Sequence, residues 1–396
     1  MKKVMFISFP AVGHVNVSIN LCKELADKNV KLLYYTLEEH FHKFEGYNNI
    51  EVRKYPDNFA EYYSEKAKIS GKIIQNLVAL LHMLYSFTDM LMPFLIKEVE
   101  KEKPDLIMCD PLSIWGKIVA RLYNIPLALL FTIFVGAGEK KIPPGAIKSM
   151  LLNMPTFIQS MMIKKRIDKK YGNLCDNPPD IMDHQGEFTI VTTSKEFHPN
   201  GHAIPDNVRF MGPTNTEHSI LPKDNKLIFV SIGTVQSNNA LWEACINATK
   251  DLGYKVAITL AGNKQNKINM KTIPDHVTIY DNLTPTEYKN MISKSVLFIS
   301  HGGASSVTDS ILGMTPLLVC PGSDETYEMG RLVKYHKCGS FYPYKKIRTD
   351  KLREEIIKVL NDDSTKSGLE KMRQFFLNSM GCKKVVEELV KEFNLI

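Results

Sequence analysis

Short apolar runs alternate repeatedly with longer helical patterns along this chain, and this alternation limits the folds that it can adopt. In the first half, four runs rich in β-branched and apolar residues predict buried strands: Val4–Phe9, Lys31–Thr36, Asp105–Asp110 and Leu127–Thr132. Three stretches with helical periodicity lie between them: Val15–Asp27, Ile73–Lys101 and Trp115–Tyr123. This alternation predicts right-handed βαβ units and a parallel sheet that is covered on both faces.

The same alternation starts again in the second half. Five further runs predict a second parallel sheet: Leu227–Ser231, Lys255–Leu260, Val277–Tyr280, Val296–Ser300 and Leu317–Cys320. Between the two sets, Phe210–Asn225 is polar, contains two prolines and has no clear periodicity, so we expect an interdomain linker there. The predicted fold class is α/β, with two Rossmann-like domains that face one cleft.

We therefore expect an N-terminal domain at 1–214, a C-terminal domain at 215–378, and a helix at 379–396 that crosses back to the first domain. Each half opens with a strand that runs into a glycine-containing loop, VMFISFPAVGH in the first and LIFVSIGTVQS in the second. Ligands bind beyond the carboxyl ends of the strands in such sheets, so both loops are candidates for ligand contact.

Composition favours a globular chain. The sequence has 396 residues, 44% hydrophobic and 23% charged, and its net charge of +7 comes from cations spread along the chain. A modest, dispersed charge gives no reason to expect a nucleic-acid partner. Seven cysteines without a CxxC pair argue against a disulfide framework and predict reduced thiols in a cytoplasmic protein.

Several familiar signatures are missing, which narrows the chemistry. No G-x-G-x-x-G follows the first strand, no Walker A sequence occurs, and the glycines at 136 and 138 lack a third partner. No HExxH, zinc-spaced Cys/His set or Asp-x-Asp pair occurs either. We therefore expect neither a bound cofactor nor a metal ion.

The segment with the most chemical information is residues 300–321, SHGGASSVTDSILGMTPLLVCP. A predicted strand here delivers two glycines to the first turn of a helix. A helix start exposes unpaired N–H groups, and Gly302 and Gly303 would let a phosphate approach the backbone. Ser305 and Asp309 share one helix face, so a hydroxyl and a carboxylate can face a bound nucleotide. An ordinary glycine-rich turn capped by serine is the alternative.

This segment resembles the nucleotide-sugar signature of the family 1 glycosyltransferases, which have the GT-B fold, and especially the bacterial macrolide-type UDP-glycosyltransferases. FPAVGHVN at 9–16 is similar to the family's opening strand and loop, whose histidine is the catalytic base. PDLIMCDPLSIWG at 104–116 resembles the segment with the aspartate that orients this histidine. FMGP at 210–213 resembles the end of the first domain, and VSIGT at 230–234 the first phosphate-contacting loop.

The resemblance implies a role for each matching residue. His14 would be the general base and Asp110 its carboxylate partner. The implied donor-binding residues are Gly13, Gly233, Thr234, Leu283, His301, Gly302, Gly303, Ser305, Ser306, Asp309 and Glu325. The implied co-substrate is a nucleotide-sugar, with a UDP-sugar as the default, and the implied activity is hexosyl transfer with inversion.

The residues themselves support this chemistry. An acceptor hydroxyl has a pKa far above 7, so its attack on an anomeric carbon needs a positioned base such as neutral histidine. Asp110, at the end of a predicted strand, could hold the tautomer of His14 and stabilise its protonated form. The leaving diphosphate would be stabilised by the helix start near Gly303, by His301 and by Thr234, without a metal. For His14 taken alone, a structural histidine is the alternative.

Some positions depart from the family pattern. Ser305 stands where the family has asparagine, and Thr286 stands where a glutamine lies near the nucleobase, after Leu283 at the ring-stacking position. The pair that holds the sugar hydroxyls aligns on Glu325 and Thr326, so the acid is kept and the amide is not. These differences leave the nucleobase and the sugar open.

The acceptor should meet the first domain. Apolar residues of Leu77–Ile96, including Leu84 and Met90, and Phe134 in the loop after the fourth strand are candidates to line its pocket. Core packing is the alternative for each of them. We expect a small apolar natural product, such as an antibiotic precursor, as the acceptor.

Two other functions fit the sequence. A membrane-peripheral enzyme acting on a lipid or sterol is suggested by the apolar stretch Leu77–Ile96 and by the basic segment Met161–Lys170. Pro93 inside the first stretch favours a core helix, and a solvated helix face is the simpler interpretation of the second. A catalytically silent nucleotide-binding protein is the third possibility, although both His14 and Asp110 are present. We expect a monomer or a homodimer.

Overall fold

The structure is a computed structural model of the chain, and it describes residues 1–67, 76–132, 134–136, 144–183, 186–199, 201–205, 207–232, 239–262, 268, 273–343 and 347–396. The chain divides into two compact units. Unit 1 contains Met1–Asn215 and Ser379–Ile396, and unit 2 contains Thr216–Asn378. This division lies one residue from the boundary expected at 214/215.

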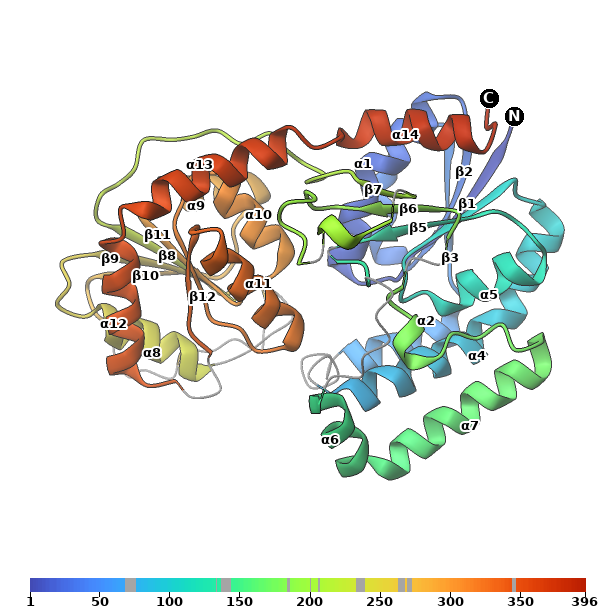
Figure 1. Cartoon of the computed structure of the whole chain (residues 1–396), viewed down its shortest axis with the longest axis horizontal. Coiled ribbons are helices and arrows are strands. Elements are labelled where there is room, and N and C mark those ends of the chain that lie inside the picture. Colours follow the sequence, from blue (N-terminus) through green and yellow to red (C-terminus); the bar gives the residue numbers. More distant parts are fainter. Residues whose placement is uncertain are drawn as a thin grey trace. The chain divides into compact units, whose positions relative to one another are not determined.

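Unit 1 is built on seven parallel strands in the order β3-β2-β1-β4-β5-β6-β7 (Figure 1). The strands are β1 Lys3–Ile7, β2 Lys31–Thr36, β3 Ile50–Lys54, β4 Leu106–Cys109, β5 Leu127–Phe131, β6 Phe188–Val191 and β7 Val208–Phe210. The chain runs outward from β1 to β3 and then returns to the other side of β1. The strand order therefore reverses between β1 and β4.

Helices cover both faces of this sheet. They are α1 Val12–Asp27, α2 Asp57–Ala67, α4 Leu77–Glu102, α5 Ile114–Leu122, α6 Pro144–Leu152, α7 Met154–Tyr171 and α14 Gly381–Glu392, with 3-10 turns η1 Glu38–Phe44, η2 Pro178–Asp180 and η3 Gly201–Ala203. Alternate residues of β1 enter two cores: Met5 packs with residues of α4 and α5, and Val4 with residues of α1 and α14. The C-terminal helix α14 is thus part of unit 1.

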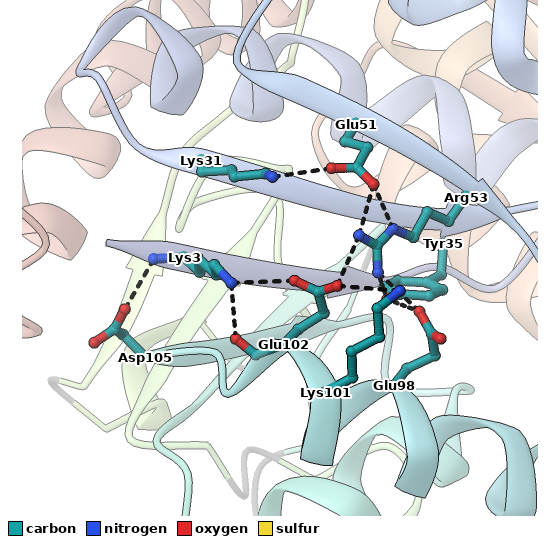
Figure 2. A network of polar contacts seen from close by, with 9 residues as sticks. All are labelled: Lys3, Lys31, Tyr35, Glu51, Arg53, Glu98, Lys101, Glu102 and Asp105. Carbon is teal, nitrogen blue, oxygen red and sulfur yellow. Dashed lines mark hydrogen bonds and ion pairs between the residues drawn. The ribbon is translucent and has the colours of Figure 1, made fainter. Parts of the chain in front are cut away.

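Ion pairs fix the end of α4 to the first strands of the sheet, as Figure 2 shows. Arg53 of β3 pairs with Glu98 at 2.8 Å and with Glu102 at 2.9 Å, and Lys3 of β1 pairs with Glu102 at 3.1 Å. Burial alone would raise the pKa of Glu102, but the hydrogen bonds from Arg53 and Lys3 lower it to about 2. Glu102 therefore stays ionised, and α4 delivers the chain into β4 from a fixed position.

α4 is a core helix of unit 1. It is the one helix of the described residues that is long and apolar enough to cross a membrane by length and composition alone. Half of its most apolar window is buried, and side chains such as Leu91 and Leu95 belong to the core beneath the sheet. The amide oxygen of Asn76 caps its start by accepting from the backbone N–H groups of Val78 and Ala79 at 3.1 and 3.3 Å.

Unit 2 has six parallel strands in the order β10-β9-β8-β11-β12-β13. The strands are β8 Leu227–Ser231, β9 Lys255–Thr259, β10 Val277–Tyr280, β11 Leu297–Ser300, β12 Leu317–Val319 and β13 Gly339–Phe341. The helices are α8 Asn239–Thr249, α9 Pro285–Lys294, α10 Ala304–Leu312, α11 Asp324–Tyr335, α12 Thr349–Leu360 and α13 Ser364–Leu377. The order reverses between β8 and β11, as it does between β1 and β4 in unit 1.

All nine predicted strands are present, with ends that differ by at most two residues. Four strands were not predicted: β3, β6, β7 and β13. Two of them, β7 and β13, have only three residues each, and β3 is a polar edge strand, IEVRK, whose residues are half-buried or exposed apart from Ile50. These three strands lack the apolar run on which the prediction depended, whereas β6, FTIV, is a buried inner strand that does have such a run.

Candidate active site

His14 and Asp110 meet at the carboxyl edge of the unit 1 sheet. Because β1 and β4 are neighbours, with Ile7 beside Cys109, the segments that follow these strands lie close together. His14 is in the first turn of α1, and its Nδ1 lies 2.5 Å from Oδ2 of Asp110. Ligands bind where the strand order reverses in parallel sheets, and this pair lies at such a position.

Asp110 determines which nitrogen of His14 is basic. Its carboxylate is buried, and Oδ1 accepts a hydrogen bond from the backbone N–H of Leu112 at 2.9 Å. An ionised carboxylate only accepts hydrogen bonds, so His14 donates its Nδ1–H and carries its basic lone pair on Nε2. The side chain of His14 is 24% exposed, so solvent reaches the ring. A histidine held in one tautomer by a carboxylate has the arrangement of a general base.

The loop between β1 and α1 is held by three hydrogen bonds that involve side chains. The hydroxyl of Tyr55 donates to the carbonyl of Ser8 at 2.7 Å, and the hydroxyl of Ser8 donates to the carbonyl of Tyr35 at 2.8 Å. Nε2 of His40 lies 3.1 Å from the carbonyl oxygen of Pro10, which only accepts, so His40 donates Nε2–H. Burial lowers the pKa of His40 and keeps its ring neutral. The first turn of α1 therefore starts from a fixed position.

Aromatic side chains pack beside His14. The ring of Phe9 lies edge-on to the imidazole, with the two centroids 5.1 Å apart. The ring of Phe9 also packs against those of Trp115 of α5 and Tyr63 of α2, with the ring centroids 6.4 Å apart in each pair. Trp115 is fully buried, whereas Tyr63 is half-buried, and burial raises the pKa of its phenol so that it stays neutral. Of the rings of Phe9, Trp115 and Tyr63, that of Tyr63 is the one that is partly exposed to solvent.

The start of α10 lies at the switch point of unit 2, directly after β11. Gly302 has a left-handed φ of +89°, and a Cβ there would lie 2.6 Å from Cγ1 of Val319, so both conformation and space require glycine. Gly303 is the N-cap of α10 and has no side chain to cap it. The first N–H groups of α10 thus have no side-chain acceptor from the N-cap, and such groups bind anions.

His301 lies against this helix start. A Cβ on Gly303 would be 2.8 Å from Nε2 of His301, so the imidazole occupies the space beside the N-cap. Nδ1 of His301 is buried and has no hydrogen-bond partner among the described residues. Burial lowers the pKa of His301 to about 4, so the ring is neutral near pH 7. An unpaired buried polar atom is costly, and at this position it fits a ligand-binding role.

Asp309 of α10 faces a histidine from the linker. Nε2 of His218 lies 2.9 Å from Oδ1 of Asp309, and the side chain of His218 is 1% exposed. The next linker residue is also fixed, because the hydroxyl of Ser293 donates to the carbonyl of Ser219 at 2.7 Å. The carboxylate that was expected to face a ribose therefore already has one partner inside unit 2.

The other predicted donor residues have varied surroundings. Gly233 and Thr234 lie outside the described residues. Ser305 is exposed, whereas the hydroxyl of Ser306 lies 3.0 Å from that of Tyr288. Gly13 is exposed on α1, and a Cβ there would meet nothing within 4 Å, so unit 1 alone does not require glycine at this position. Leu283 is half-buried and directly precedes the N-cap of α9, and Thr286 is exposed in the first turn of that helix.

Thr326 does not replace the glutamine of the family pattern. Its hydroxyl accepts from the N–H groups of Gly322 and Ser323 at 3.1 and 3.0 Å and lies 3.1 Å from the carbonyl oxygen of Ser323, to which it donates. These bonds close the start of α11. Glu325, the preceding residue, is exposed. Of the pair predicted to hold the sugar, only the acid is exposed, because Thr326 is buried.

The three residues predicted to bind the acceptor differ in how deeply they are buried. Phe134 follows β5 and is half-buried, with its ring edge-on to that of His198 at 5.3 Å. Met90 is half-buried and packs against the core of unit 1. Leu84 is 1% exposed within that core. Core packing accounts for Leu84, so we do not include it among the residues proposed to line the acceptor pocket.

Four residues near these sites were not predicted: His40, Tyr55, Tyr63 and His218. Tyr63 had a sequence signal, because Phe59, Tyr62 and Tyr63 follow helical spacing and contact the same core. His40 and His218 had none, since their partners lie 30 and 91 residues away in the sequence.

Comparison with known proteins adds to these observations. Residues 227–389 match the glycosyltransferase family 28 C-terminal domain. YojK of Bacillus subtilis, named a UDP-glucosyltransferase, is 24% identical over 99% of this chain and 97% of its own length. The demethyllactenocin mycarosyltransferase of Streptomyces fradiae is 22% identical over 94% of this chain and 82% of its own. The crystal structure of CalG4, the calicheamicin glycosyltransferase, has a TM-score of 0.77, with 20% identity and coverage of 99% of this chain and 98% of that one.

The chain has two parallel-sheet units, each with a candidate site at its switch point. Together with these matches, this arrangement defines a glycosyltransferase of the GT-B fold. These matches confirm the resemblance to the family 1 glycosyltransferases that the motifs predicted, and the chain is a glycosyltransferase.

Proposed function

We propose that this enzyme transfers a sugar from a nucleotide-diphosphate donor to a hydroxyl of a small apolar natural product, with inversion at the anomeric carbon. The observation that carries the proposal is the contact of 2.5 Å between His14 and the buried carboxylate of Asp110 at the switch point of unit 1. This pair supplies the base that a hydroxyl acceptor needs.

The reaction balances as a single displacement. The acceptor hydroxyl gives its proton to Nε2 of His14 while its oxygen forms a bond to the anomeric carbon. The bond from that carbon to the diphosphate breaks, and the nucleoside diphosphate leaves with the electron pair. Attack opposite the leaving group inverts the anomeric centre. Asp110 stabilises the imidazolium that results, because its carboxylate lies beside Nδ1.

The donor is proposed to bind unit 2. The first turn of α10, opened by Gly302 and Gly303, would accept the diphosphate, and His301 would add a neutral N–H donor. Thr234, which lies outside the described residues, is proposed to contribute on the strength of the resemblance in VSIGT. We propose no metal or cofactor for this step. A UDP-sugar remains the default donor, supported by the name of the relative YojK.

The acceptor is proposed to bind unit 1 next to the aromatic group at His14. Phe9 and Tyr63 offer uncharged ring surface beside the base, which suits an apolar acceptor with a flat region. Phe134 and Met90 remain candidates for the same pocket. The names of the relatives that act on demethyllactenocin and calicheamicin support an acceptor of the natural-product class.

A thermal-shift screen with UDP, dTDP, GDP and their common sugars tests the donor site. A nucleotide that binds only the folded protein increases the free energy of unfolding by about 2.7 kcal/mol at a hundredfold excess over Kd, and so raises the melting temperature. We expect one nucleotide to raise it selectively in the wild type and in His14→Ala. Gly303→Trp should abolish the shift, because its side chain would fill the space at the start of α10.

The same screen, combined with an assay of sugar transfer, distinguishes the proposed enzyme from a catalytically silent nucleotide-binding protein. A shift with a nucleotide, but no turnover of any sugar donor by the wild type in the presence of varied acceptors, would favour the silent protein. A shift that Gly303→Trp retains would contradict the donor site at α10.

A further inference from the structure

Exposed apolar side chains are concentrated on α6 and α7 of unit 1. Six of the sixteen large hydrophobic side chains that are exposed in the described structure lie between residues 147 and 162, with exposed fractions between 38% and 73%. They are Ile147, Leu151, Leu152, Met154, Ile158 and Met162. Single exposed apolar residues are normal on protein surfaces, but a group of this kind marks a contact surface.

The apolar residues of α7 form one stripe along the helix. Met154, Ile158 and Met162 are spaced by four residues and therefore lie on the same face. The opposite face, with Ser160 and Ile167, is buried where α7 lies along α4 (Figure 1). The exposure of the stripe is thus a consequence of how α7 packs, and the outward residues contribute nothing to the core.

Cationic side chains continue the same stripe. Lys165 and Lys169 follow Met162 at helical spacing, are exposed, and form no ion pair with the described residues. Arg166 is also exposed, although it pairs with Asp89 of α4 at 2.5 Å. Residues 144–171 as a whole contain six cationic side chains and one carboxylate. The N-terminal half of the stripe is therefore apolar, and its C-terminal half is strongly positive.

We propose that this surface, formed by α6 and α7, docks on an anionic lipid membrane. A helix with an apolar stripe and adjacent lysines lies in the interface of a bilayer, with the apolar side chains among the acyl chains and the cations at the headgroups. Anionic headgroups complement the excess of positive charge. A second copy of this chain does not, because two such surfaces facing each other would bring like charges together.

The proposal does not depend on the proposed function, because it concerns attachment and not the reaction. It gives the enzyme a place at the membrane surface, where apolar molecules concentrate. It takes up the first of the two interpretations of the basic segment Met161–Lys170, namely contact with a membrane. The exposed apolar residues beside the lysines favour the membrane over a merely solvated helix face.

Co-sedimentation with lipid vesicles tests the proposal. The full chain is mixed with vesicles of phosphatidylcholine alone, or of equal parts of phosphatidylcholine and phosphatidylglycerol, at low and high salt. We expect most of the wild type to sediment with the anionic vesicles at low salt, little with the neutral ones, and less as added salt screens the lysines.

Two pairs of variants separate the apolar from the cationic contribution. I158S/M162S and K165E/K169E should each lose most of the binding to anionic vesicles. Both should keep the melting temperature of the wild type, since all four side chains are exposed. The matched controls carry the same changes on exposed residues of unit 2, I220S/I357S and K250E/K366E, and should bind like the wild type.

Other outcomes would overturn the proposal. One is a wild type that stays in the supernatant with anionic vesicles. Another is a loss of binding in K250E/K366E as large as in K165E/K169E, which would show that only net charge matters. A third is a wild-type dimer that I158S/M162S converts to a monomer without any change in vesicle binding, which would assign the surface to a second copy of the chain.

Discussion

Two histidines in this protein each face an aspartate, and the two pairs expose opposite members. In unit 1, the side chain of His14 is 24% exposed and that of Asp110 is 5% exposed. In unit 2, the side chain of His218 is 1% exposed and that of Asp309 is 15% exposed. The first pair therefore presents an imidazole to solvent, and the second presents a carboxylate.

The same two residue types can therefore serve different chemistry. A buried carboxylate behind an exposed ring fixes the tautomer and stabilises the protonated ring, which suits proton transfer. A buried ring behind a carboxylate can only orient that carboxylate, which suits hydrogen bonding to ligand hydroxyls. We therefore expect His14 to control turnover, whereas we expect His218, as a positioning residue, to control donor affinity through Asp309.

The largest effect is expected for His14→Ala. Without the base, the acceptor hydroxyl cannot pass on its proton, so kcat should fall by about 10³-fold, within the range for general bases. The Kd of the nucleotide should stay within about twofold, because unit 2 is unchanged. Initial rates at saturating donor, together with calorimetric titration of the nucleotide, measure both quantities. Turnover equal to that of the wild type would remove His14 from the mechanism.

A smaller effect is expected for Asp110→Asn. The amide NH₂ can donate to Nδ1 of His14 and so favours the tautomer with its proton on Nε2, where no basic lone pair remains. We expect kcat to fall by about 10²-fold, at the lower limit for loss of base catalysis. Asp110→Glu, which keeps the carboxylate, serves as the matched control and should recover part of the rate. Equal rates for Asn and Glu would show that the charge of Asp110 is unimportant.

The smallest effect is expected for His218→Ala. Without His218 to orient it, Asp309 should lose its proposed hydrogen bond to the donor. A hydrogen bond to a charged group is worth about 1.5–3 kcal/mol, so the KM for the donor should rise by about tenfold or more. The kcat should change by less than about twofold, since the base is intact. His218→Gln can still donate to Asp309 and should recover much of the affinity. Steady-state kinetics with varied donor separates KM from kcat. A loss of kcat as large as that of His14→Ala would show that the two pairs do not have different roles.

Features that depend on a few neighbouring residues could be predicted from the amino-acid sequence. Apolar periodicity predicted nine strands close to their observed ends, and the glycines at 302 and 303 predicted a helix start open to a ligand. These features follow from side-chain alternation and from backbone conformations that only glycine adopts easily. The pairing of His14 with Asp110 came from resemblance to a family, because no local pattern connects residues 96 positions apart.

What each of these residues faces depends on how the whole chain folds. Strand order made β1 and β4 neighbours and so placed Asp110 beside His14. Chain folding brought His218 of the linker to Asp309 and turned the hydroxyl of Thr326 into its own helix cap. It also buried Leu84 while leaving Ile158 and Met162 exposed, although all three are apolar residues in helices. Burial and long-range pairing depend on which elements pack against each other, and that choice is made by the whole chain rather than by any one segment.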